Sequence, residues 1–310
     1  MPQEKLDYVE ATGERTVDIG DLDLRRNLKF RAFLGLALAP VFRELLPRLR
    51  YVEMGRRGVT PGQYFQDFRS HPAPHGYGDR FQGHYAIRLC RSVSLEQRES
   101  SMEPQRVERL VLETRATLTG SPAAGATASL GFEPPLGAPV TAGEARVLHV
   151  LSRPQGPPGG RWVTDVPEEI GFLQVHPLEE AFPTIAELAE PGDGFVELTD
   201  VAAEYGGVWG VANSDVFQHI HAREYTMAME NGITQCLAAA RLPLESYIAL
   251  RARTIFRRPA FVGQPYRVRV RLFRRDAEVV ALGAFRRPDD DASQDDKRAA
   301  VFLRFEGKLS

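Results

Sequence analysis

The chain has 310 residues, of which 43% are hydrophobic and 26% are charged, and its formal net charge at pH 7 is −2. This composition is typical of a soluble globular protein and excludes a disordered or fibrous chain, and the near-zero net charge argues against a dedicated nucleic-acid binder. The length fits two domains of about 150 residues each.

Neither membrane insertion nor secretion is expected from the sequence. No apolar run approaches the roughly 20 residues of a membrane-spanning helix, and the N-terminus lacks the basic start and apolar core of a signal peptide. Cys90 and Cys236 are the two cysteines, too few for a disulfide framework or an unaided zinc site. We therefore predict a cytoplasmic protein without a metal or a cofactor, in which both cysteines are buried as small hydrophobic residues.

The first predicted helix covers residues 28–49. It carries apolar side chains on nearly every face, at Phe30, Phe33, Leu34, Leu36, Leu38, Val41, Phe42, Leu45 and Leu46. A helix that is apolar on most faces is buried, and does not lie on the surface. The segment that leads into it, residues 21–29, contains charged residues but no histidine.

A loop rich in His and Pro follows at residues 71–78. It contains His71 and His75 but no cysteine, and the first acidic residue after them is Asp79. Such a set of side chains is a poor metal site. We therefore interpret this segment as a surface loop.

Proline and glycine concentrate between Pro134 and Gly160. Such a composition resists regular structure and often marks a connection between domains. We therefore predict an N-terminal domain over residues 1–135, a Pro/Gly-rich connection over residues 136–170 and a C-terminal domain over residues 171–310.

Three pairs of segments in the two halves are weakly similar and occur in the same order. They are residues 80–89 and 260–270, residues 109–115 and 278–284, and residues 128–133 and 301–306. Three matches in register favour an internal duplication of one fold.

Polar and ionisable residues crowd into the first part of residues 213–232. Asp215 and His219 lie four residues apart before a predicted helix over residues 222–240, and Glu230 lies eleven residues beyond His219. Eleven residues are close to three helical turns, so we expect Glu230 on the face that begins near His219. Two acids and an imidazole at a helix N-terminus can carry out proton chemistry. The alternative is that Asp215 only caps the helix.

Three strands are predicted after this helix, over residues 244–256, 266–273 and 278–285. In the second of them, apolar residues alternate with arginines. This alternation is typical of a half-exposed antiparallel strand.

Residues 215–225, Asp-Val-Phe-Gln-His-Ile-His-Ala-Arg-Glu-Tyr, resemble the signature Asp-x-Asn-x-His-Val-Asn-Asn-x-x-Tyr of hotdog-fold thioesterases, especially the fatty acyl-carrier-protein thioesterases. The first Asn of the family falls here on Phe217, and its Asn pair falls on His221 and Ala222. The resemblance implies an α+β fold of two hotdogs in tandem, each an antiparallel sheet wrapped around a long central helix. The helices would be those predicted over residues 28–49 and 222–240.

The same resemblance implies roles for the residues of the site. Asp215 would position or activate water, His219 would orient or polarise the substrate, and Glu230 would be a supporting or alternative base on the helix. Free N–H groups at the helix start would stabilise the oxyanion. The residues that bind the substrate would be Phe217, Gln218, His221 and Tyr225. The N-terminal hotdog, which lacks the histidine, would have a degenerate site and would shape the cavity.

The resemblance therefore predicts an acyl-thioester hydrolase acting on acyl-CoA or acyl-carrier-protein substrates in fatty-acid or polyketide metabolism. Nine arginines between Arg251 and Arg275 fit the phosphates of coenzyme A or an acidic carrier protein, although a solvated strand face explains them equally well. Neither nucleic acid nor a membrane is expected as a partner, and a homodimer of double hotdogs is one option for the assembly.

Phe217 leaves two other functions open, because an apolar ring replaces a hydrogen-bonding group. One is a polyketide-type acyltransferase/decarboxylase or a dehydratase on the same fold, in which Tyr64 or Tyr225 supplies the reacting hydroxyl group. The other is a non-catalytic acyl-binding module.

Overall fold

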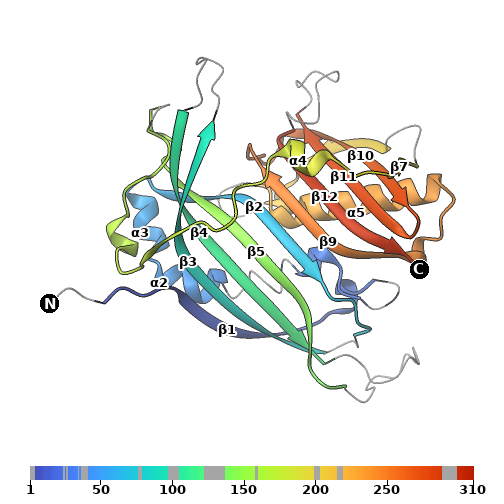
Figure 1. Cartoon of the computed structure of the whole chain (residues 1–310), viewed down its shortest axis with the longest axis horizontal. Helices are drawn as coiled ribbons and strands as arrows, with labels where there is room; N and C mark the ends of the chain where they lie inside the picture. The colour runs from blue at the N-terminus through green and yellow to red at the C-terminus, as the bar shows by residue number, and fades with distance from the viewer. Residues whose placement is uncertain are drawn as a thin grey trace.

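A single 12-stranded sheet is the framework of the molecule (Figure 1). The computed structural model describes residues 4–23, 25, 27–33, 35, 41–75, 79–96, 105–121, 137–157, 160–198, 203–214, 219–287 and 299–310. Its strand pairs are antiparallel, except that β6 (Val175–Pro177) pairs in parallel with β3. The expected α+β fold is confirmed as a mostly antiparallel sheet with few helices, as in a hotdog-like fold.

The strand order repeats in the two halves of the chain. The N-terminal strands are β1 (Val9–Thr16), β2 (Thr60–Ser70), β3 (Arg80–Glu96), β4 (Gln105–Gly120) and β5 (Val140–Ser152), in the order β1-β3-β4-β5-β2. The C-terminal strands are β7 (Val196–Glu197), β8 (Ala203–Val208), β9 (Tyr247–Phe256), β10 (Pro265–Arg275), β11 (Glu278–Arg286) and β12 (Val301–Leu309). The last four follow the order β9-β12-β11-β10, and both β7 and β8 pair with β10. Each half therefore places its four long strands in the same order, counted outward from the middle.

Strands β2 and β9 join the two halves. They pair in antiparallel register from Phe65 opposite Ile255 to Arg69 opposite Arg251. The guanidinium of Arg251 also donates two hydrogen bonds to Asp67, at 2.8 and 2.5 Å. This two-pronged geometry is the strongest form of an Arg–carboxylate pair, so backbone and side chains both fix the junction.

Apolar side chains pack on both faces of the sheet. The larger cluster lies on the inner face, where α5 (Ala222–Ala239) and the helical pieces of the N-terminal half pack. On the outer face, a second cluster lies beneath α4 (Ile185–Ala189) and includes Phe65 and Phe302. The outer face also carries Glu113, fully buried, which accepts hydrogen bonds from Arg88 and from Arg146 Nε, the latter at 2.6 Å.

Helix α5 confirms the prediction for residues 222–240. It packs closely on β10, because a Cβ added at Gly232 would lie only 2.4 Å from the Val270 side chain. One turn further, Cys236 Sγ lies 3.7 Å from the carbonyl oxygen of Val270. The three strands predicted after this helix are also confirmed, as β9, β10 and β11.

The helix predicted over residues 28–49 is described in pieces, and its continuity through residues 36–40 stays a prediction. Residues 30–33 are helical, and a π-helical turn at Val41–Leu45 is followed by the short helices α2 (Leu46–Arg48) and α3 (Tyr51–Arg56). Leu34, Leu36 and Leu38 lie outside the described residues. Pro47 lacks the N–H that a regular helix requires, and the hydrogen bonding changes from π-helical to α-helical beside it. Phe30, Phe33 and Leu45 are buried as expected.

The segment predicted as an irregular connection contains β5. Its residues 140–151 are rich in Val, Leu and Ala, whereas the prolines lie on either side of the strand. Two of the three sequence matches fall on strands in equivalent positions, β3 with β10 and β4 with β11. Residues 128–133 lie outside the described residues, and β5 occupies the place equivalent to β12. The domain limits themselves stay a prediction.

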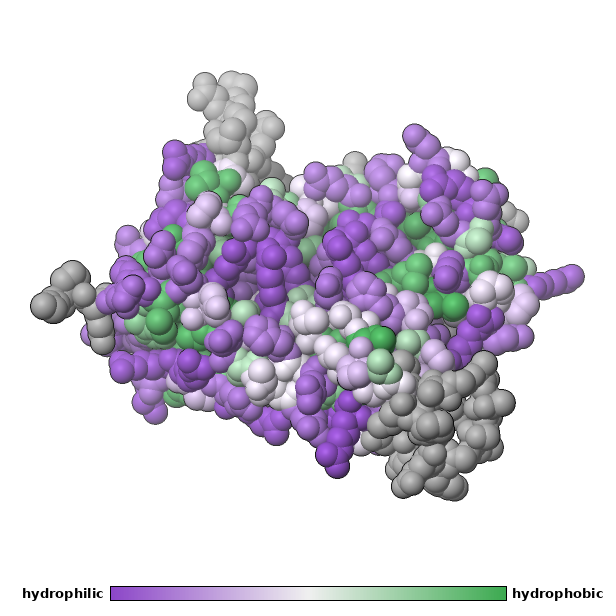
Figure 2. Space-filling view, turned by 60° about the horizontal axis from the view of Figure 1, so that its bottom comes forward, coloured by the Kyte–Doolittle hydropathy of each residue, from purple (hydrophilic) through white to green (hydrophobic). Residues whose placement is uncertain are grey.

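The burial of the cysteines is confirmed. The interpretation of residues 71–78 as a surface loop is wrong for His75, which is 1% exposed and whose ring lies 4.7 Å from that of Phe81. No helix among the described residues is long and apolar enough to cross a membrane. The face shown in Figure 2 is mostly hydrophilic, with apolar side chains in separate small patches.

Candidate active site

The loop before α5 is closed by backbone contacts at its base. Ser214 forms an isolated bridge with Ile220, and the N–H of His221 donates to the carbonyl oxygen of Asn213 at 2.9 Å. The N–H of Ile220 donates to the carbonyl oxygen of Ala260 at 3.0 Å, which ties the loop to the segment between β9 and β10. His221 then occupies the N-cap position, and α5 begins at Ala222. The loop is thus held at the positive end of the helix dipole.

Asp215, Phe217 and Gln218 lie outside the described residues. The described residues on either side of this segment are Ser214 and His219. His219 is exposed and pairs with Phe261 in an isolated bridge, with the two rings 5.0 Å apart. The structure therefore places an exposed imidazole beside the start of α5.

Aromatic side chains form an apolar wall in the first turns of α5. Tyr225 is buried, and its ring lies 5.2 Å from that of Trp209, 5.1 Å from that of Phe285 and 6.0 Å from that of Phe256. Burial raises the pKa of the Tyr225 phenol, so it stays protonated. The Tyr225 phenol is thus not activated as a nucleophile, and its role in binding a substrate stays a prediction.

Asn213 and Glu224 form a polar contact that the sequence did not predict. Asn213 Nδ2 donates to Glu224 Oε2 at 2.7 Å, and Arg223 Nε donates to Glu224 Oε1 at 3.3 Å. Glu224 is only 5% exposed, and Asn213 Oδ1 in turn accepts the N–H of Gly210 at 2.9 Å. The pair connects the incoming loop to the first turn of α5. A Glu in the first turn of a predicted helix was the signal that could have indicated it.

Glu230 contacts the N-terminal half of the chain. Burial raises the pKa of its carboxyl group to about 7, while the charge of Arg31 and hydrogen bonds from the backbone of Arg31 and Phe30 favour the ionised form. His219 precedes α5 and pairs as an extended residue, so the placement of Glu230 on the face that begins near His219 stays a prediction. Glu230 is nevertheless a carboxyl group that exchanges a proton near neutral pH.

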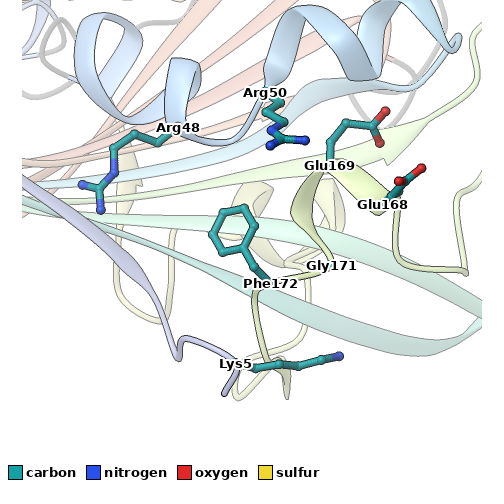
Figure 3. Close-up of a pocket in the computed structure, with 7 residues that line it drawn as sticks. All are labelled: Lys5, Arg48, Arg50, Glu168, Glu169, Gly171 and Phe172. Atoms are coloured by element: carbon teal, nitrogen blue, oxygen red, sulfur yellow. The ribbon is translucent and has the colours of Figure 1, made fainter. Parts of the chain in front are cut away.

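A cleft of about 430 Å³ lies at the far end of the N-terminal half (Figure 3). Its lining residues are Lys5, Arg48, Arg50, Glu168, Glu169, Gly171 and Phe172. None of them belongs to the predicted site. Among the described residues, no group of three or more His, Cys, Asp or Glu side chains is arranged to hold a metal ion.

The geometry at α5 suits attack on a carbonyl group. The helix N-terminus offers backbone N–H groups and a positive dipole end to a developing oxyanion. An exposed imidazole, that of His219, lies beside the helix start, and the buried ring of Tyr225 lies in the first turn of the helix. This combination is typical of small-molecule sites.

Comparisons with solved structures show likeness over nearly the whole chain. A Lactobacillus plantarum protein provisionally assigned as an oleoyl thioesterase matches with a TM-score of 0.65 and 9% identity, covering 98% of this chain and 97% of that one. The 12:0-ACP thioesterase of Umbellularia californica matches with a TM-score of 0.61 and 12% identity, covering 97% and 94%. An acyl-ACP thioesterase of Bacteroides thetaiotaomicron matches with a TM-score of 0.53 and 10% identity, covering 97% and 98%.

The likeness is one of structure and not of sequence. No protein-family model and no curated protein matches this chain. At such identities the three matches show a shared fold. Function depends on the particular site residues that each protein carries on that fold.

Proposed function

We propose that this chain, which shares the fold of acyl-ACP thioesterases over nearly its whole length, hydrolyses acyl thioesters. The observation that carries the proposal is the end-to-end structural match, which includes both halves and the junction between them. The loop and helix start around His219 and Tyr225 supply the chemical features that such a reaction needs.

The fold that we propose is a tandem of two hotdogs. The repeated strand order of the two halves supports it, as does the packing of α5 on β10. The helical pieces between Phe30 and Arg48 would be the N-terminal counterpart of α5. The two units would form a pseudo-dimer through β2 and β9.

The proposed catalytic residues are Asp215, His219 and Glu230. Asp215 activates a water molecule, whose oxygen attacks the thioester carbonyl carbon, and the oxyanion faces the start of α5. His219 orients the carbonyl group or protonates the sulfur as the carbon–sulfur bond breaks. The products are a carboxylic acid and a thiol, and no cofactor is required.

Glu230 enters this scheme through its raised pKa. A carboxyl group with a pKa of about 7 is a better base near neutral pH than an ordinary carboxylate. It would act as a supporting or alternative base. The proposed substrate-binding residues are Phe217, Gln218, His221 and Tyr225.

The leaving thiol would belong to coenzyme A or to an acyl carrier protein, in fatty-acid or polyketide metabolism of the cytoplasm. Arg267 and Arg269 on β10 are exposed, and they offer positive charge to phosphates or to an acidic carrier surface. A homodimer of such double hotdogs is the assembly that we propose.

The test is thiol release from a panel of acyl-CoA and acyl-carrier-protein thioesters of 8 to about 18 carbons, a range that spans the reach of cavities of typical size. Hydrolysis that Asp215→Asn abolishes supports the proposal. Absence of turnover together with a trapped acyl-protein would indicate an acyltransferase. Absence of turnover with tight binding of the acyl substrate would indicate a binding module.

A further inference from the structure

Two glutamines on the inner face of β2 carry buried side-chain atoms without hydrogen-bond partners among the described residues. Gln66 is 0% exposed, and neither its Nε2 nor its Oε1 has a partner among the described residues. The Nε2 of Gln63 is likewise buried and without a partner there. Orphaned polar atoms are rare in folded proteins and call for an explanation such as a ligand or an ordered water.

The register of the sheet gathers further polar groups around these glutamines. Gln66 lies directly opposite Thr254 on β9, and Gln63 lies opposite His149 on β5. Gln66, His149 and Thr254 face the helix side, because Phe68, Val147 and Phe256, each two residues away along its strand, belong to the inner core. Gln63 precedes a β-bulge in β2 and lies opposite His149, so it shares the face of His149. The four residues form a polar cluster, which we call the seam cluster, where the two halves meet.

The seam cluster is close to the candidate active site. Phe256, two residues beyond Thr254 on the same face of β9, contacts Tyr225 with the rings 6.0 Å apart. Two residues of strand span about 7 Å, and neighbouring strands lie about 4.8 Å apart. An acyl chain that passes the aromatic wall at the start of α5 therefore reaches Thr254 and Gln66 within a few carbon atoms.

A saturated acyl chain cannot satisfy the amide of Gln66. It would leave the N–H and C=O groups desolvated and unpaired, which costs free energy. A hydroxyl group both accepts from the amide N–H and donates to the amide oxygen, and a keto oxygen accepts from the N–H. Sites built to bind a substrate oxygen discriminate strongly against analogues that lack it.

We propose that Gln63, Gln66, His149 and Thr254 form a specificity subsite for a hydroxyl or keto group on the acyl chain of the substrate. The proposal rests on the proposed thioesterase function and narrows its substrate class. Burial lowers the pKa of His149 to about 4, so the imidazole is neutral and adds a donor and an acceptor to the subsite.

The experiment compares kcat/KM for saturated, hydroxylated and keto acyl-CoA thioesters of equal length, in the wild type and in Gln66→Leu. We expect the wild type to prefer an oxygenated chain by tenfold or more, the factor for about one net hydrogen bond. Gln66→Leu should remove this preference and favour the saturated chain. Thr114→Val, a polar-to-apolar change at another buried inner-face position on β4, should retain it. Thermal unfolding identifies a variant that fails to fold.

Calorimetric binding of free hydroxy and saturated fatty acids gives a second readout that needs no hydrolysis. If saturated thioesters are hydrolysed but neither assay shows a preference for the oxygenated chain, the subsite proposal is wrong and the amide of Gln66 binds only water. The proposed thioesterase function then stands. If no thioester is hydrolysed while hydroxy acids bind more tightly in a Gln66-dependent manner, the subsite stands and the hydrolase function fails.

Discussion

Glu230→Gln should flatten the pH dependence of stability. The carboxyl group has a pKa of about 7 in the folded chain against an ordinary value of 4.5, so the folded state binds more protons than the unfolded state between these pH values. The contribution of Glu230 to the free energy of unfolding is therefore fully present below pH 4.5, and it is lost as pH rises through 7. At about 1.4 kcal/mol per tenfold change in proton affinity, the loss is about 3 kcal/mol, an upper limit because solvent screens a partly buried group.

The amide of the variant cannot titrate, but its oxygen still accepts from the backbone N–H groups of Phe30 and Arg31. Urea unfolding at several values between pH 4.5 and 8 measures the free energy of unfolding for both proteins. We expect the free energy of unfolding of the variant, relative to that of the wild type, to increase steadily as pH rises. Glu245→Gln, at an exposed position, should follow the wild type. Parallel curves for wild type and Glu230→Gln would refute the burial of a titrating carboxyl group at this contact.

Three other predictions concern the site and its helix. Asp215→Asn should lower kcat by about 10²-fold or more with unchanged thermal stability, whereas an Asp that only caps α5 predicts nearly unchanged activity, since Asn caps equally well. Asn213→Ala should lower the free energy of unfolding by roughly 1.5–3 kcal/mol, because Glu224 loses a hydrogen bond to a buried charge; an unchanged urea midpoint would exclude this contact. Gly232→Ala should destabilise by about 1–3 kcal/mol by pushing α5 off β10, while Gly55→Ala, with open space around its Cβ, should be neutral or slightly stabilising.

The second half of the fold could be predicted because its patterns are local. Alternating Val and Arg in β10 and the long run of helix-forming residues in α5 depend only on neighbours along the chain. The helix over residues 28–49 was predicted from its apolar content alone, and its described parts between Phe30 and Arg48 are helical. Strand β5 was missed because the prediction was based on the prolines and glycines around it and not on the alternating side chains within the strand itself.

The site was predicted only in part, because it depends on contacts that no local pattern contains. Spacing along one helix cannot show that Glu230 meets Phe30 and Arg31, which lie about 200 residues earlier in the chain. The Asn213–Glu224 pair requires the loop to fold back over the helix start. The roles of Asp215, His219 and Glu230 stay a prediction.

The junction of β2 and β9 has a consequence for any attempt to divide the molecule. Removing one half would unpair residues 65–69 or 251–255 and leave an edge strand with free N–H and C=O groups. Because both halves place their first long strand at this edge, a liberated half would find in its own copies a surface of the same kind. Such fragments should therefore be recovered as homodimers or aggregates, because the single backbone of the intact chain is what keeps these two edges paired with each other.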